Sequence, residues 1–331
     1  MDVNNETKCV LFAFADVSQL DFNVTLFTDF LIVGGKLGIQ KFYTELAVIL
    51  LVLYLIVLGG NLVILTVVIL DSRLHIPMYI FLSNLAFIDI VITTTVLPKM
   101  ISVCLWNNIT ISFSGCFLQM YIYLSFQSAE GFLLSVMAYD RYVAVCNPLR
   151  YNSIITNGVC ALLATIAWVL AFILPALSVI LATQLPFCNN EIMYWFCDYP
   201  PVVTLSCFDT TYLIDLALAC ALVIMYFPFT FIVWTYSKII ASVCKISSSE
   251  GRWKAFSSCT SHLTIVLAFY FAHSCVYISA KAKNIHPNVL ILISIVNSFL
   301  TPLMNPVLYT LRNKEIKVAL RKLIHVNKGF P

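Results

Sequence analysis

The stretch MAYDRYVAVCNPLRY, Met137 to Tyr151, places an adjacent acid and base at the end of a long apolar run. Asp140 and Arg141 are followed by a few more apolar residues, and the run stops at Pro148. Ionisable side chains are expensive in a bilayer, so such a pair marks a functional site if the run crosses a membrane.

The composition indicates that the run does cross a membrane. The chain has 331 residues, of which 61% are hydrophobic and 11% are charged. Soluble domains are about 45–50% apolar and about 25% charged. So much apolar surface predicts a protein that spans a bilayer several times. The formal net charge is only +3, without a basic block, so nucleic acid is not expected as a partner.

Seven segments are long and apolar enough to cross a bilayer, which takes about 20 residues. They are roughly 44–70, 77–101, 114–145, 155–181, 211–236, 256–279 and 287–310. Apolar residues also recur at helical spacing against a basic face in RNKEIKVALRKLI, which favours a short helix on the membrane surface. The sequence thus predicts an all-α membrane protein with an N-terminal segment (1–43), a seven-helix bundle (44–310), and an amphipathic eighth helix with a tail (311–331).

The distribution of Lys and Arg predicts that the N-terminus is extracellular. With that orientation, thirteen of these residues lie on the cytoplasmic side and six on the outer side, as the positive-inside rule requires. The Asn-x-Ser/Thr sequons at Asn5, Asn23 and Asn108 would then all lie outside, where they can be glycosylated. We therefore expect a multi-pass protein of the plasma membrane, in contact with membrane lipid.

Two carboxylic acids, Asp89 and Glu130, lie inside predicted spans. Facing carboxylates cannot both stay charged without a cation between them. One hypothesis is a site where they bind Na⁺ or share a proton. The alternative is a pair of neutral acids that hydrogen-bond to Asn61 and Asn305. No other metal and no cofactor are expected.

The Asp140–Arg141 pair suggests a switch. A guanidinium at the inner end of a span needs a carboxylate partner, and a pair held by local geometry can be broken and remade. Such a pair fits a conformational switch between two states, whose equilibrium a ligand bound on the opposite side of the membrane could shift. The simpler interpretation is an arginine that anchors the end of a helix.

Several stretches resemble rhodopsin-type G-protein-coupled receptors, and more narrowly the odorant receptors. They are GN at Gly60–Asn61, PMYIFLSNLAFID at Pro77–Asp89, MAYDRYVAVCNPLRY, KAFSSCTSHL at Lys254–Leu263, FY at Phe269–Tyr270 and PLMNPVLYTLRN at Pro302–Asn313. MAYDRYVAVCNPL together with KAFSSCTSHL is highly specific for this family. The resemblance covers all but the fourth and fifth spans.

The resemblance implies roles for matched positions. Cys116 would pair with Cys197, and Cys188 with Cys207, to fix the second extracellular loop. A cytoplasmic switch would comprise Asp140, Arg141, Tyr142, Tyr236, Asn305, Pro306 and Tyr309. A small odorant would open it to a stimulatory heterotrimeric G protein, which raises cyclic AMP.

A ligand site is expected between the outer halves of the helices, with apolar walls and few polar groups. The candidate residues are Tyr123, Leu124, Gln127, Tyr270, His273, Ser274 and Tyr277. Each could instead be a packing residue. Amine receptors place an Asp where Tyr123 stands, so an amine receptor of that kind is not expected.

The alternatives are a non-olfactory receptor of the same superfamily and, less favoured, a transporter or channel. KAFSSCTSHL argues against the first, and the lack of related halves argues against the second. The sequence contains neither a GxSxG motif nor an HExxH motif, so an enzyme is not expected.

Overall fold

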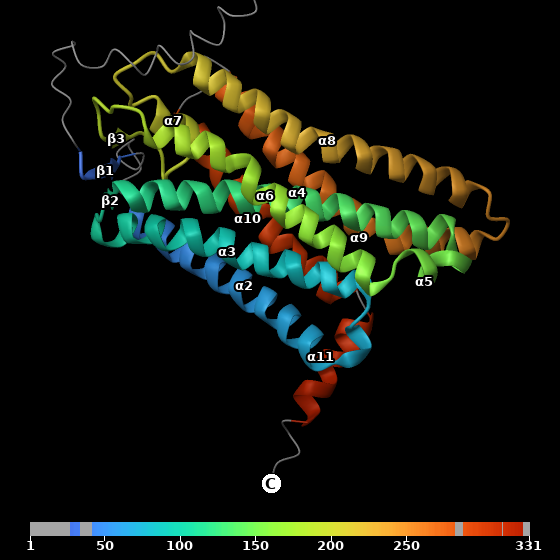
Figure 1. Ribbon diagram of the computed structural model, residues 1–331. Helices are drawn as coiled ribbons and strands as arrows, with labels where there is room; N and C mark the ends of the chain where they lie inside the picture. The colour runs from blue at the N-terminus through green and yellow to red at the C-terminus, as the bar shows by residue number, and fades with distance from the viewer. Residues whose placement is uncertain (1–26, 34–41, 282–286, 313, 327–331) are drawn as a thin grey trace, which may run out of the picture.

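The computed structural model describes residues 27–33, 42–281, 287–312 and 314–326. Within them, seven long helices form one bundle (Figure 1). These helices are α2 (Tyr43–Leu70), α3 (Pro77–Trp106), α4 (Phe113–Cys146), α6 (Asn157–Thr183), α8 (Thr211–Cys244), α9 (Ser249–Lys281) and α10 (Pro287–Arg312). The bundle agrees with the predicted architecture.

Most of the seven helices are longer than the apolar runs that predicted them. α8 continues to Cys244 and α9 begins at Ser249, whereas the apolar pattern indicated 211–236 and 256–279. The added turns contain polar residues, among them Ser237, Lys238 and Ser249, which are exposed at the end of the bundle. Hydropathy therefore locates the membrane-embedded part of a helix rather than its ends.

Five of the described helices contain a stretch long and apolar enough to span a membrane: α2, α3, α6, α8 and, in α9, Cys259–Val276. α10 contains a shorter apolar stretch, Ile295–Leu308. α4 is more polar because it lies among the other helices, where it packs against α3, α6, α8 and α9. Its polar side chains, including Gln127 and Glu130, are buried in protein and do not face lipid.

The two ends of the bundle differ (Figure 1). One end, here called the sheet end, carries the short helix α7 (Tyr199–Val203) and the strands β1 (Asp29–Ile32), β2 (Thr110–Ser112) and β3 (Glu191–Ile192). The other end, here called the α11 end, carries α11 (Lys314–Val326) and α5 (Tyr151–Ile154). Two 3-10 turns, Ser72–Leu74 and Pro148–Arg150, complete the elements of the described chain.

The small sheet was not predicted from the sequence. Its strand order is β2-β1-β3, with β1 antiparallel to β2 and parallel to β3. Phe30 of β1 is fully buried, and its ring lies 5.6 Å from that of Phe113 and 5.3 Å from that of Phe187. β1 therefore joins the first segment of the chain to two distant loops through backbone hydrogen bonds and an aromatic cluster.

Local signals in the sequence explain where several helices begin and end. The Ser112 hydroxyl accepts a hydrogen bond from Gly115 N at the start of α4, and the Thr156 hydroxyl accepts one from Val159 N at the start of α6. α3 ends at Asn107, which adopts a left-handed conformation with φ of 51°. Asn is one of the few residues that tolerate this conformation.

Candidate functional site

Two disulfides fix the loop that precedes α8. Cys116 at the start of α4 is bonded to Cys197, and Cys188 is bonded to Cys207. The pairing is the one that the resemblance implied. A further contact holds the same loop, because Cys197 N donates a hydrogen bond to Gln119 Oε1 at 3.0 Å. The loop therefore has a fixed position across the sheet end of the bundle.

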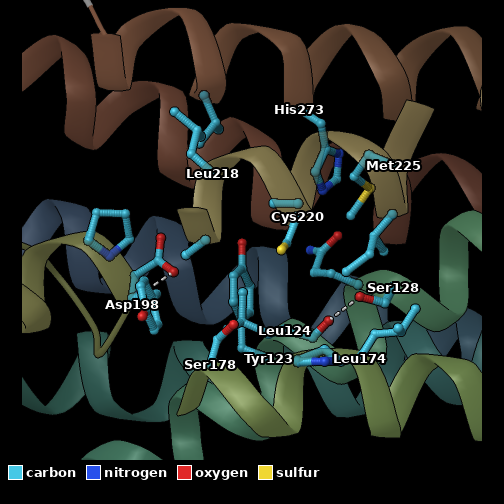
Figure 2. A pocket seen from close by; sticks show the side chains of 18 of the residues that line it. Tyr123, Leu124, Ser128, Leu174, Ser178, Asp198, Leu218, Cys220, Met225 and His273 are labelled. Atoms are coloured by element: carbon cyan, nitrogen blue, oxygen red, sulfur yellow. Dashed lines mark hydrogen bonds between the residues drawn. The ribbon is translucent and has the colours of Figure 1, made fainter. Parts of the chain in front are cut away.

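A cavity of about 220 Å³ lies below this loop. It is bounded by α4, α6, α8, α9, α10 and the loop around α7 (Figure 2). The lining residues are mostly apolar, among them Leu124, Leu174, Leu218, Ile224 and Met225. A small, mostly apolar cavity with a few polar groups is the usual form of a small-molecule site.

The structure brings four of the seven predicted ligand residues to this cavity: Tyr123, Leu124, Gln127 and His273. Two others do not line it. Tyr270 packs between Phe229 and Phe269, with ring centroids 4.5 and 5.0 Å away. The Ser274 hydroxyl is bonded to the Tyr270 carbonyl and to the Tyr226 hydroxyl. These two residues belong to the α8–α9 contact, and the Tyr277 side chain lies outside the described part of the chain.

Asp198, which lines the cavity from the loop, was missed by the sequence reasoning. Its Oδ1 accepts a hydrogen bond from Tyr199 N at 2.8 Å, which caps α7. Burial raises the pKa of this carboxyl group to about 6, although the Tyr199 N–H opposes the shift. Its position directly after Cys197 was the only signal in the sequence, because the disulfide places the next residue over the bundle.

A second polar centre lies deeper, around Asp89 and Glu130. Both residues are fully buried, and the Asp89 carboxyl interacts electrostatically with that of Glu130. Asn305 Nδ2 donates a hydrogen bond to Asp89 Oδ2 at 2.8 Å. Asn61 does not bond to either acid in the described residues; its Nδ2 donates to the carbonyls of Val57 and Pro302 instead. Of the two hydrogen bonds in the alternative interpretation, the one from Asn305 is therefore present and the one from Asn61 is not found among the described residues.

The switch pair lies at the α11 end of α4. Arg141 Nη2 lies 2.6 Å from Asp140 Oδ2, and Arg141 Nε lies 3.0 Å from the same oxygen. The Tyr151 hydroxyl of α5 donates to Asp140 Oδ1 at 2.6 Å. Burial and the Asp140 carboxylate raise the pKa of the Tyr151 phenol, which keeps it a donor. Asp140 thus binds both Arg141 and Tyr151, and so connects the end of α4 to the following helix α5.

A second connection ties α9 to α4 and α8. His262 Nε2–H donates to the Leu134 carbonyl at 3.1 Å, so Nδ1 is the acceptor of the ring. The Tyr236 hydroxyl donates to that Nδ1 at 2.7 Å. Tyr236 was expected in the switch, whereas His262 was noted only as part of the KAFSSCTSHL stretch. No local pattern predicts that Tyr236 and His262 pair, because α8 and α9 meet only in the folded bundle.

The structure describes contacts for two of the remaining predicted switch residues, Tyr142 and Pro306. Tyr142 contacts Trp234 of α8, with ring centroids 5.6 Å apart. Pro306 packs against Gly60, where a Cβ atom would lie 2.7 Å from the Pro306 Cβ. Gly60 is therefore required for the close approach of α2 and α10. The side chain of Tyr309 lies outside the described part of the chain.

One of the three predicted glycosylation sites falls in the described residues. Asn108 is exposed in the turn between α3 and β2, at the sheet end. Its Oδ1 accepts hydrogen bonds from Lys99 and Thr110, and no hydrogen bond of its Nδ2, the glycosylated atom, occurs in the described structure. Asn5 and Asn23 lie outside the described residues.

The fold has a counterpart among solved structures. It matches the crystal structure of squid rhodopsin with a TM-score of 0.70, over 88% of this chain and 87% of that one. Sequence identity is 17%, so this likeness concerns the fold. The protein is a helical membrane protein with the rhodopsin fold.

Sequence comparisons identify the family. The family profile described as "Olfactory receptor" matches residues 50–327. Human olfactory receptor 2AT4 is 41% identical over 88% of this chain and 91% of its own length. Human olfactory receptor 10J1 is 40% identical over 95% and 97%, and mouse olfactory receptor 10J5 is 39% identical over 92% and 98%.

The chain belongs to the olfactory receptor family. It is an odorant-activated G-protein-coupled receptor and not an enzyme.

Proposed function

We propose that the cavity below the disulfide-fixed loop is the odorant site, and that its occupation opens the α11 end to a stimulatory heterotrimeric G protein, which raises cyclic AMP. The observation that carries this proposal is the path of α4. One helix lines the cavity with Tyr123, Leu124 and Gln127 and ends at the Asp140–Arg141 pair. A small movement of α4 or its neighbours at the cavity therefore acts directly on the pair.

The sheet end faces the outside of the cell in this proposal, and the chain resides in the plasma membrane with an extracellular N-terminus. The disulfides and the Asn108 sequon all lie at the sheet end. Disulfides persist in oxidising surroundings. The basic residues of α11, Lys317, Arg321 and Lys322, lie at the opposite end, as the positive-inside rule requires.

Two connections close the α11 end in the described state. Asp140 holds Arg141 and Tyr151, and His262 holds α9 against Leu134 of α4 and Tyr236 of α8. Opening requires α9 to leave these partners, which frees the Tyr236 hydroxyl for Arg141. A ligand that fits the cavity better when α9 is displaced shifts this equilibrium.

The experiment is a cyclic AMP reporter in cells that express the chain, with an odorant panel. Arg141→Ala should abolish the odorant response because it removes the guanidinium that the G protein meets. Arg150→Ala is the matched control, since Arg150 is exposed in the adjacent turn. Surface expression is measured for each variant. An equal response in Arg141→Ala, or an odorant-evoked ion current without a G protein, would contradict the proposal.

The buried acids form a Na⁺ site or share a proton in this proposal. Asp89 Oδ1, Glu130 Oε1 and Asn305 Oδ1 are buried and have no hydrogen-bond partner among the described residues. An all-oxygen set suits a hard cation, and a shared proton satisfies the same need for charge balance. Asp89 and Glu130 would hold the cation, which would supply positive charge between them.

A thermal unfolding measurement on the purified receptor distinguishes the two forms of this site. With a Na⁺ site, sodium chloride raises the Tm relative to choline chloride at equal ionic strength, and Asp89→Asn removes the difference. With a shared proton, the Tm is the same in both salts.

A further inference from the structure

The cavity contains an acidic group whose charge is not balanced in the described structure. Asp198 lines the cavity near its sheet end, while His273 and Ser128 lie farther along (Figure 2). The hydrogen bond found for its carboxylate is the one from Tyr199 N to Oδ1. The ion pairs of the described residues are Arg73–Asp71 and Arg141–Asp140, so no Lys or Arg in this part of the chain pairs with Asp198.

Three other polar side chains of the cavity, His273, Gln127 and Asn297, also present hydrogen-bond acceptors. His273 Nδ1–H donates to the Phe269 carbonyl at 2.9 Å, which leaves Nε2 of the neutral ring as an acceptor. Gln127 Oε1 and Asn297 Oδ1 are buried without a hydrogen-bond partner in the described residues. One of the two donors of the Asn297 amide is used, because Nδ2 donates to the Tyr123 hydroxyl at 3.3 Å.

The donors that line the cavity, among them the Gln127 amide and the Ser178 and Tyr199 hydroxyls, are all uncharged. Ser128 Oγ donates to the Leu124 carbonyl at 2.8 Å, and no Lys or Arg is among the lining residues of the described chain. An anionic ligand would meet an acidic group without a balancing cation. A ligand that accepts hydrogen bonds but donates none would leave several buried acceptors unsatisfied, which is costly.

We propose that this cavity binds small alkyl amines, whose ammonium group pairs with Asp198 and whose chain lies along the apolar wall. An ammonium group carries three donors and a positive charge, so it satisfies the carboxylate more fully than a neutral hydroxyl does. The elevated pKa of Asp198, about 6, still leaves the group mostly ionised at neutral pH. The proposal rests on the proposed function, because it names the ligand class of the same site.

This amine site differs from the one that the sequence argued against. The absence of an acid at position 123 excludes an amine held by α4 at that point. Here the acid comes from the loop, directly after the disulfide at Cys197. Tyr123 lines the same cavity, and its ring packs against Phe196 with centroids 4.9 Å apart.

The experiment compares four probes with one chain length and different head groups: octylamine, octanol, octanal and octanoate. Each is tested for cyclic AMP in cells and for a shift in the Tm of the purified receptor. Octylamine should activate at the lowest concentration and give the largest Tm shift, and octanoate should do neither. A larger Tm shift with octanal or octanoate, or no shift with any probe, would overturn the proposal.

A matched pair of variants isolates the charge. Asp198→Asn keeps a side-chain oxygen that caps α7 but removes the charge, since Asn and Asp are comparable N-caps. It should raise the octylamine concentration needed for half-maximal response at least tenfold, with little effect on the octanol response. Asp209→Asn is the control, because Asp209 also accepts hydrogen bonds from a nearby residue, Thr211, but is exposed outside the cavity.

The outcomes separate this inference from the proposed function. If octanal raises cyclic AMP through Arg141 and octylamine does not, the amine inference fails and the receptor function stands. If octylamine shifts the Tm but no probe raises cyclic AMP, the ligand class stands and the signalling proposal fails. Equal octylamine potency in wild-type receptor and a surface-expressed Asp198→Asn variant would also overturn the inference.

Discussion

Asp140 and Asp198 are acids at opposite ends of the bundle, and their surroundings differ. Asp140 accepts hydrogen bonds from Arg141 and from Tyr151. Asp198 accepts one from the N–H of its neighbour Tyr199, and the described residues provide no cation for it. The first acid is fully partnered within the chain and can hold a conformation. The second lacks a charged partner and can take one from a ligand.

The largest change in signalling is expected when Asp140, the acid with partners in the chain, loses its charge. Asp140→Asn removes the carboxylate from a charge-assisted contact, which is worth about 1.5–3 kcal/mol, a roughly ten- to hundredfold change in the equilibrium. Arg141 is then released, and basal cyclic AMP should rise without odorant. The measurement is ligand-free reporter signal, normalised to surface expression.

Tyr151→Phe should have a smaller effect than Asp140→Asn on basal signal. It removes one neutral donor and keeps the Asp140–Arg141 pair, so basal signal should rise only a few-fold. Basal activity that stays at the wild-type level in Asp140→Asn would show that this acid does not hold the closed state.

A smaller effect is expected from changing the pH outside the cell. The Asp198 carboxyl has a pKa of about 6, so it loses its negative charge as the pH falls. From pH ~7.5 to ~5 the ionised fraction drops to about a tenth, while an alkyl amine stays protonated, as a lysine does. Octylamine potency should therefore fall by about tenfold.

The titratable side chains that share the cavity with Asp198 are Tyr123, Tyr199, Cys220 and His273. Of these, only a histidine ordinarily titrates in this pH range. Asp198→Asn is therefore the control, and its octylamine response should not depend on pH. A shift that persists in this variant would assign the effect to His273.

The features that depend on local sequence patterns could be predicted from the sequence. Apolar runs located the seven helices, and the resemblance placed the disulfides and the Asp140–Arg141 pair. Tyr123, Leu124 and Gln127 were predicted as ligand residues and do line the cavity, because they lie close together on one helix, α4. The side chains on α9 were harder to place: His273 lines the cavity, but Tyr270 faces α8.

The features that were missed depend on contacts between distant segments. Asp198 reaches the cavity only because a disulfide folds its loop over the bundle. His262 and Tyr236 meet across two helices. The sheet joins three segments, none of which has enough alternating apolar residues to signal a strand alone.

The strand β1 also constrains how the receptor is made. Leu31 pairs with Glu191, and four long helices, α2, α3, α4 and α6, separate these residues in the chain. β1 is synthesised before these four helices, whereas β3, its parallel neighbour, is synthesised after them. β1 can therefore pair with β3 only after α6 has been synthesised, and a receptor truncated before Glu191 would lack the β3 partner of this strand.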